Sequence, residues 1–405
     1  MRRANLLSGV PALGAMCLAA SSALAQEGGV TLVFGIEQRF ESGSNIGLDV
    51  PATGSTNVSA TRLSFGLTTE TQIDRLEFNA SSALLVENSF DIDGTEAQLG
   101  RPDLSFGYTR EIPNAIFSVT AAYRRDDVDA FDDDITAVDE VGTRSDSRAE
   151  VYFETGRTAP LGFAASASYA LSDYEDTTDP DLNDTETVRV GLRTLLRFSD
   201  VMVGTVGLSF EREQEDDLAQ TVTETSTAFA GLEYSMPNGT LSGTLTLADE
   251  TDESRRVTFE VGRSMVLLDG EFNARIGVTT ADDSGTDLIG AVEWTRAQPD
   301  GGIGVSLERT VSFDDETEVD TTFAVDWRRE VNAVSSFAVD FSYEVSDSPS
   351  ERIEQAEIGA AYGYALTEAW NLDTGIRYRV REDNDGRAES PSIFVALGRS
   401  FVFRP

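Results

Sequence analysis

Two short stretches of the chain repeat arginine at a spacing that puts the side chains on one face of an extended strand. They are Arg189, Arg193 and Arg197 in the first stretch and Arg377, Arg379 and Arg381 in the second. Residues two or four apart share a face because successive side chains of a strand point to opposite sides. A row of guanidinium groups can hold carboxylates in pairs or act on passing ions. These two rows of arginines could therefore act on solutes electrostatically.

Acidic residues repeat at the same alternating spacing elsewhere, and Arg328 stands among them. These acids are Asp320, Asp326, Asp340, Glu344, Glu150, Glu154, Glu260 and Glu271. Walls of opposite charge on one water-filled space would create a transverse field that orients solutes and sets ion preference. The simpler alternative is that each residue only forms an ion pair between neighbouring strands. Both interpretations stay open for each residue.

The composition excludes most catalytic chemistry. The 405 residues include 71 Asp and Glu, no His, one Cys (Cys17) and no Lys, since all 31 basic residues are Arg. Without His there is no Ser-His or Cys-His nucleophile, and without Lys there is no Schiff base. Paired carboxylates can hydrolyse sugars, but so many acids produce pairs by chance everywhere. We therefore predict no enzyme, no cofactor and no metal site.

The formal charge of −40 excludes nucleic acid as a partner, because such binding needs a basic surface. The first residues form a separate processing segment. A basic start at Arg2 and Arg3 precedes a short apolar stretch, and Ala23-Leu24-Ala25 fits the small-residue rule for cleavage. We predict that residues 1–25 are a cleaved signal peptide and that residues 26–405 form one domain.

After the signal peptide the chain alternates apolar and polar residues in segments of about ten, as half-buried strands do. The clearest examples are Thr187–Phe198, Val319–Arg329, Ser335–Val345 and Trp370–Arg381. We count about 20 such segments between Val30 and Phe403. Charged residues at every second position indicate one wet face, and β-branched and aromatic residues indicate one apolar face.

The connections between the segments alternate between two kinds. Short ones are Ser199–Asp200, Ser235–Gly239, Ala297–Gly302, Glu330–Val334 and Ala365–Ala369. Longer, acidic ones are Ser42–Asn57, Glu87–Pro102, Arg125–Ser147, Ser172–Glu186, Glu211–Glu224 and Glu382–Ser390. This alternation is typical of an up-and-down meander with two unlike ends.

The apolar face could meet lipid or the core of a soluble all-β protein, such as a sandwich or a solenoid. Three features favour lipid. The segments are long enough to cross a bilayer at barrel tilt, and charges on the apolar face lie only at segment ends. Aromatic residues on that face also collect beside the short turns, as in membrane barrels. These residues are Phe198, Tyr234, Phe272, Trp294, Trp327, Phe337, Tyr364 and Trp370.

The signal peptide, the amphipathic segments, the short turns, the acidic loops and the terminal segment Ser392–Phe403 together resemble a Gram-negative outer-membrane β-barrel. Within that class the chain resembles the β-barrel porins of Proteobacteria, over the whole mature sequence and by pattern alone. The resemblance implies an all-β, closed, antiparallel up-and-down barrel of about 18–20 strands, with short periplasmic turns and longer acidic extracellular loops. One departure is that Arg404 and Pro405 follow Phe403, where such chains usually end on an aromatic residue.

A barrel of this size leaves a lumen. We predict a porin-like outer-membrane channel for passive diffusion of small hydrophilic solutes or ions. The alternative is a barrel without transport, with a structural, surface-interaction or polysaccharide-export accessory role. No plug domain is expected, because the strand pattern begins at Val30. The predicted pore-lining residues are Arg189, Arg193, Arg197, Asp320, Asp326, Arg328, Asp340, Glu344, Arg377, Arg379 and Arg381.

The expected partners are outer-membrane lipid, lipopolysaccharide and the barrel-assembly machinery, which would read the C-terminal strand. Whether copies of the barrel associate with one another is left open. Asp91–Gly94 and Asp383–Gly386 resemble fragments of calcium loops, but neither continues to the Glu that an EF-hand requires.

Overall fold

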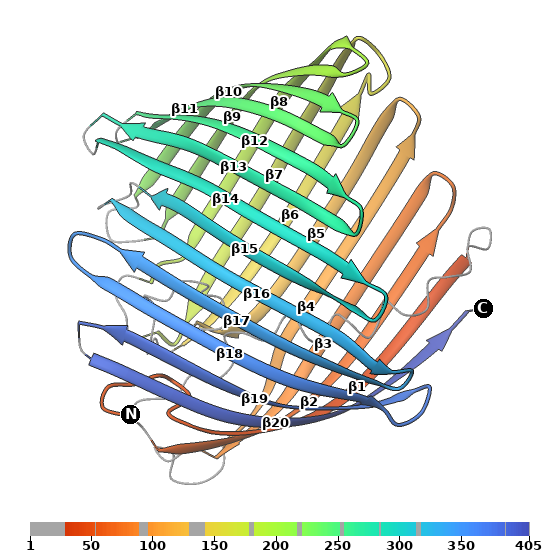
Figure 1. Ribbon diagram of the computed structural model, residues 1–405, viewed down its shortest axis with the longest axis vertical. Helices are drawn as coiled ribbons and strands as arrows, with labels where there is room; N and C mark the ends of the chain where they lie inside the picture. Colours follow the sequence, from red (N-terminus) through yellow and green to blue (C-terminus); the bar gives the residue numbers. More distant parts are fainter. Residues whose placement is uncertain are drawn as a thin grey trace.

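The computed structural model describes residues 29–52, 54–88, 96–128, 142–177, 182–216, 221–251, 255–282, 285–312, 317–384 and 386–404. They form 20 strands of one antiparallel sheet that closes into a barrel (Figure 1). Each strand pairs with the next along the chain. The first strand also pairs with the last, from Leu32 opposite Phe403 to Gly43 opposite Ser392, and this pairing closes the ring.

The first ten strands are β1 Gly29–Ser44, β2 Ser55–Glu70, β3 Asp74–Asn88, β4 Glu96–Ile112, β5 Ala115–Asp127, β6 Thr143–Thr155, β7 Leu161–Glu175, β8 Thr185–Ser199, β9 Met202–Glu215 and β10 Val222–Met236. The second ten are β11 Gly239–Glu250, β12 Arg256–Leu267, β13 Gly270–Ala281, β14 Gly285–Gln298, β15 Gly301–Ser312, β16 Glu318–Asn332, β17 Ser335–Asp347, β18 Arg352–Ala365, β19 Trp370–Asp383 and β20 Gly386–Phe403. The predicted fold class and strand number are confirmed.

The outer face of the barrel is apolar and uncovered. Leu192, Leu208, Ile276 and Ile376 lie near the middle of their strands, and each is about three-fifths exposed. A monomeric protein in water rarely exposes so continuous an apolar surface, whereas lipid covers it without cost. No helix within the described ranges is long and apolar enough to cross a membrane.

Aromatic rings on the outer face gather near the short turns and link neighbouring strands. The ring of Phe34 lies 5.0 Å from that of Phe65 and 5.9 Å from that of Phe403, measured between centroids. Trp327 and Phe337 pack edge-on at 5.9 Å. Such pairs contribute about 0.5–1.5 kcal/mol beyond the area they bury. The Phe34–Phe403 contact therefore helps to hold the first strand to the last.

All six predicted long loops are shorter than expected, and two of them illustrate the reason. β19 runs to Asp383 and β20 begins at Gly386, so the expected loop Glu382–Ser390 is a tight turn. The expected loop Glu87–Pro102 shrinks because β4 already begins at Glu96. Both predictions took polar residues to end a strand. Strands that project beyond the membrane are wet on both faces, so polar side chains do not interrupt their ladders there.

The connection between β1 and β2, residues 45–54, is called loop 1, and its described residues 45–52 fold inward. Ile46 is 5% exposed and packs with Val58 and Leu85, which point into the barrel from β2 and β3. This is a small apolar core inside the ring. The predicted signal peptide and the fragment Asp91–Gly94 lie outside the described residues.

Candidate functional site: the charged lumen wall

The eleven residues predicted to line a pore lie on four strands, β8, β16, β17 and β19, and all are on the face opposite the exposed apolar residues. The strand register fixes this placement. In β16 and β17, Trp327 is opposite Val339 on the outer face, so Asp326 and Asp340 are opposite each other on the inner face. In β19, Ile376 and Tyr378 are exposed outside, which turns Arg377 and Arg379 inward.

The arginine row on β8 is engaged along its whole length. Arg189 forms an ion pair with Glu211 of β9. Arg193 donates from Nη2 to the Tyr152 hydroxyl at 2.7 Å and lies 3.4 Å from Glu154 Oε2, both on β6. The row is thus part of a paired wall.

Arg193 reaches Glu154 across an intervening strand. In β7 the residue between them in register is Ala164, whose methyl group leaves the space above it open. The same arrangement recurs on the far wall, where Arg275 of β13 pairs with Glu308 of β15 above Ala291 of β14. A small residue on the middle strand therefore lets charges two strands apart meet.

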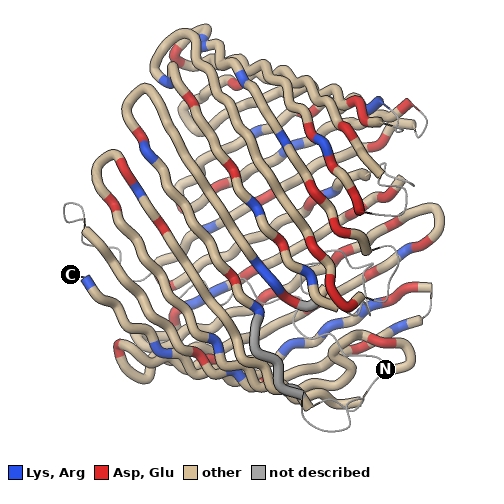
Figure 2. Tube along the Cα trace, turned by 180° about the vertical axis from the view of Figure 1, so that it is seen from behind, with Lys and Arg blue, Asp and Glu red and all other residues tan. Residues whose placement is uncertain are grey.

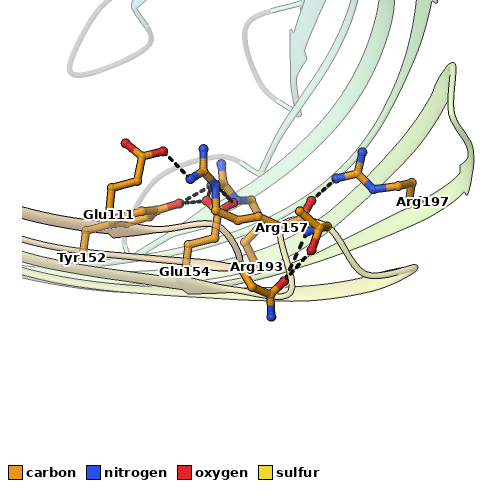
Figure 3. Close-up of polar contacts among 8 residues, drawn as sticks. Glu111, Tyr152, Glu154, Arg157, Arg193 and Arg197 are labelled. Carbon is orange, nitrogen blue, oxygen red and sulfur yellow. Dashed lines mark hydrogen bonds and ion pairs between the residues drawn. The ribbon is translucent and has the colours of Figure 1, made fainter. Parts of the chain in front are cut away.

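A denser polar cluster lies where the β8 row reaches the short-turn end (Figure 3). Tyr152 donates to Glu154, and Arg157 Nη1 lies 2.6 Å from Glu111 Oε1 of β4. Arg157 Nε lies 3.8 Å from Glu154 Oε1, and Arg197 donates to the main-chain carbonyl of Arg157. The cluster borders an open pocket of about 680 Å³ lined also by Gln72, Ile73, Ile112, Pro113 and Thr158.

The turn between β6 and β7 positions Arg157. Gly156 has a φ of 78°, and a Cβ there would overlap the Leu161 carbonyl, so this conformation needs glycine. Asn114 of the neighbouring turn accepts hydrogen bonds from Thr158 N and Oγ1 at 3.3 and 3.0 Å. The hydrogen bond to Glu111 raises the pKa of Arg157 above its ordinary value, and burial opposes this rise.

The arginine row on β19 is buried inside the barrel. Arg377 Nε lies 2.9 Å from Glu357 Oε1 of β18, and Arg381 Nε lies 3.0 Å from Asp383 Oδ2. Arg379 donates from Nη2 to the carbonyl of Ile46 in loop 1 at 2.5 Å. All three side chains are about nine-tenths buried.

Loop 1 is held in place by its own polar residues. Asn45 Oδ1 accepts from Asp49 N, and Asn45 Nδ2 donates to Asp49 O, each at 3.1 Å. The main-chain nitrogen of Asn45 donates to Gly54 O at 3.0 Å, which brings the two ends of the loop together. Asn45 is 2% exposed. The loop is therefore a compact cover over the inner wall.

The wall formed by β10–β18 carries inward-facing carboxylates with few arginines. The inward acids there are Glu233, Glu250, Glu260, Glu271, Asp287, Glu293, Glu308, Glu318, Asp320, Asp326, Glu330, Asp340, Glu344 and Glu357. The inward arginines are Arg256, Arg275 and Arg328. Figure 2 shows further acids gathered at strand ends beside the long connections.

Sequence reasoning missed the partners of both arginine rows. Tyr152, Glu111 and Arg157 come from two other strands and a turn, and no local spacing links them to Arg193. The contact of Arg379 with loop 1 was also missed. A usable signal existed in Ile46 and Leu48, since apolar residues in a predicted outer loop need a place to be buried.

No family model matches the sequence, and no curated protein matches it either. Solved structures match the fold at low identity. The siderophore receptor PirA from Pseudomonas aeruginosa is 12% identical, with a TM-score of 0.52 over 93% of this chain and 81% of the receptor. A variant of the ferric enterobactin receptor PfeA from the same organism is 10% identical, with a TM-score of 0.54 over 93% of this chain and 81% of that chain.

A third structure, OccK7 (OpdD) from Pseudomonas aeruginosa, is 11% identical over 94% of this chain and all of that one, with a TM-score of 0.41. At 10–12% identity the two receptor likenesses show the fold alone. The chain has the fold of a Gram-negative outer-membrane β-barrel. In such barrels the short turns face the periplasm and the longer loops face outward.

Proposed function

We propose that the chain is a porin-like channel through which small hydrophilic solutes or ions diffuse passively across the outer membrane. The observation that carries the proposal is a closed ring of 20 strands in which several inward charged side chains stay exposed, among them Arg62, Glu293 and Asp326. Side chains fill the interior of an eight-stranded barrel, whereas rings of 16–18 strands leave an aqueous channel.

The barrel dimensions support the same proposal. Twenty strands spaced about 4.8 Å apart and tilted by about 40° give a backbone radius of roughly 20 Å. Inward side chains reach only part of the way to the axis. Loop 1 covers the wall near β1, β19 and β20, and it is held there by Arg379. Water and small solutes would pass between loop 1 and the acidic wall.

Conductance of the purified, folded protein in planar bilayers tests the proposal directly. Discrete current steps at low voltage are expected, and sugars should cause swelling of liposomes that contain the barrel. A barrel that folds and inserts but passes neither ions nor sugars would contradict the channel. That result would favour the alternative, a barrel with a structural, surface-interaction or export-accessory role.

A separate prediction concerns the β8 arginine row. If Arg193 and Arg197 line the narrowest part of the lumen, replacing both with Ala should change conductance and ion preference. The cost in stability should stay within about 1 kcal/mol for the Arg193 ion pair, because that side chain is two-fifths exposed and solvent screens the pair. Bilayer recordings and urea unfolding of the double variant measure the two effects. Unchanged currents would assign these arginines to holding the wall together.

A further inference from the structure

Resting on the proposed channel function, we propose that the channel prefers cations over anions. The inner wall consists of two parts that differ in the charged side chains they present to the lumen. One part, formed by β19, β20 and β1–β9, contains most of the inward arginines. The other part, formed by β10–β18, contains the acids described above and three arginines. Solutes would therefore pass along a wall of net negative charge.

The arginines of the first part are largely neutralised by neighbours. Arg39 of β1 lies 2.9 Å from Glu41 and stacks over the Phe394 ring with its guanidinium carbon 4.0 Å from the centroid. Arg189, Arg377 and Arg381 each form an ion pair with a carboxylate. Arg62 and Arg197 are exposed and form no ion pair among the described residues. Glu37 faces Arg62 in register, and Arg197 donates to the Arg157 carbonyl. An arginine paired with a carboxylate contributes little to the electric field farther out in the lumen.

Loop 1 removes a further positive charge from the water. The Arg379 guanidinium is buried under the loop and donates to the Ile46 carbonyl, which carries no compensating charge. The loop itself contributes the acidic residue Asp49, which is also buried. The inward fold of loop 1 thus covers the row of arginines that would otherwise face the acidic wall.

The carboxylates of the second part are left facing the lumen. In the part of the chain that the structure describes, Glu260, Glu293, Asp320, Asp326 and Asp340 make neither an ion pair nor a side-chain hydrogen bond. Asp326 and Glu293 are exposed, and the other three are half-buried. Arg328 lies two residues from Asp326 on the same face and forms no ion pair with any described residue.

Asp326 and Asp340 show how unpaired acids are accommodated. They are directly opposite each other in the ladder of β16 and β17, a position in which like charges destabilise a sheet. Each carboxylate turns away from the other and lies over a glycine of the flanking strand. A Cβ on Gly304 of β15 would collide with the Asp326 carboxylate, and one on Gly359 of β18 would collide with that of Asp340.

This arrangement gives the two aspartates no role in holding the strands together. Replacing both with Asn keeps the shape of the side chains and removes the like charges. The Asp326→Asn/Asp340→Asn barrel should therefore be at least as resistant to urea as the original barrel. A structural role for the pair would instead make the variant less stable.

Reversal potentials in a KCl gradient across a planar bilayer test the inference. For the original barrel we expect a potassium-to-chloride permeability ratio several-fold above unity near 0.1 M salt. The ratio should fall toward unity near 1 M, because the Debye length shrinks from about 10 Å to about 3 Å. The Asp326→Asn/Asp340→Asn variant should lose part of the preference at low salt and still conduct.

The matched control is Asp269→Asn, the same change on the turn between β12 and β13, where Asp269 pairs weakly with the outward-facing Arg296 at 3.9 Å. This variant should keep the original ratio. A conducting barrel with a ratio at or below unity overturns the cation preference and leaves the channel standing. An unchanged ratio in the double variant overturns the role of these two acids. A folded barrel without current overturns the channel and this inference together.

Discussion

Leu245→Arg is expected to lower the free energy of unfolding of the membrane-inserted barrel by about 2–4 kcal/mol, the cost of an arginine at the centre of the lipid-facing surface. Leu245 lies in the middle of β11 and is 42% exposed on the outer face. The new guanidinium would lie far from both interfaces, where its stem is too short to reach water without distorting the bilayer. Urea titration of the barrel in lipid vesicles, followed by heat-modifiable migration, measures the loss.

The adjacent residue provides the control for this prediction. Thr244 points into the lumen, and its register partner on β12 is Glu260. Thr244→Arg therefore places the same charge in water beside a carboxylate, and its effect should stay within about 1 kcal/mol. Equal destabilisation by the two variants would contradict a lipid-covered outer face. Strong destabilisation by Thr244→Arg alone would mean that the two faces are reversed.

The alternation of residues was enough to predict the faces of the strands. In β16, Phe323, Val325 and Trp327 point outward, as their spacing predicts. The reason is physical, since a strand with lipid on one side and water on the other has no freedom to change its period. Strand number followed from the same alternation, because each crossing of the membrane must repeat it.

The ends of the strands were predicted less well. The polar residues from Glu382 to Ser390 were expected to form a loop, yet the ladder of β19 and β20 continues through most of them. Outside the membrane both faces are wet, so composition no longer distinguishes strand from loop. Hydrogen bonding between the strands then decides where each one ends.

The charged wall was predicted only in outline. Alternation identified which charges turn inward, but it could not assign their partners. Arg193 meets Glu154 because Ala164 on the strand between them is small, and this depends on the register of three strands at once. Arg379 meets the Ile46 carbonyl because a loop distant in sequence folds back over β19. Neither relation has a local sequence signal.

The second prediction with a large expected effect concerns the conductance of a barrel that lacks loop 1. Deleting residues 46–53 joins Asn45 to Gly54, and the ladder pair Ser44–Ser55 stays in register on either side. Asn-Gly is the dipeptide that two-residue hairpin turns prefer, and Asn45 already has a φ of 50°. The shortened barrel should therefore still fold, with an open mouth at its extracellular end.

In this deletion variant, conductance should rise, because the loop no longer occupies part of the lumen cross-section. The cation preference should fall at the same time, because the Arg379 guanidinium becomes exposed to the lumen. Single-channel recordings and reversal potentials measure both changes on the same protein.

Combining the deletion with Arg379→Ala separates the effect of a wider lumen from the effect of the exposed Arg379 charge. The combined variant should keep the higher conductance and regain the cation preference, since the exposed positive charge is gone while the acidic wall of β10–β18 is unchanged. If the deletion leaves conductance as it was, loop 1 does not obstruct the lumen. If conductance rises but the cation preference is the same with and without Arg379, residues outside the β19 row determine the electric field in the lumen.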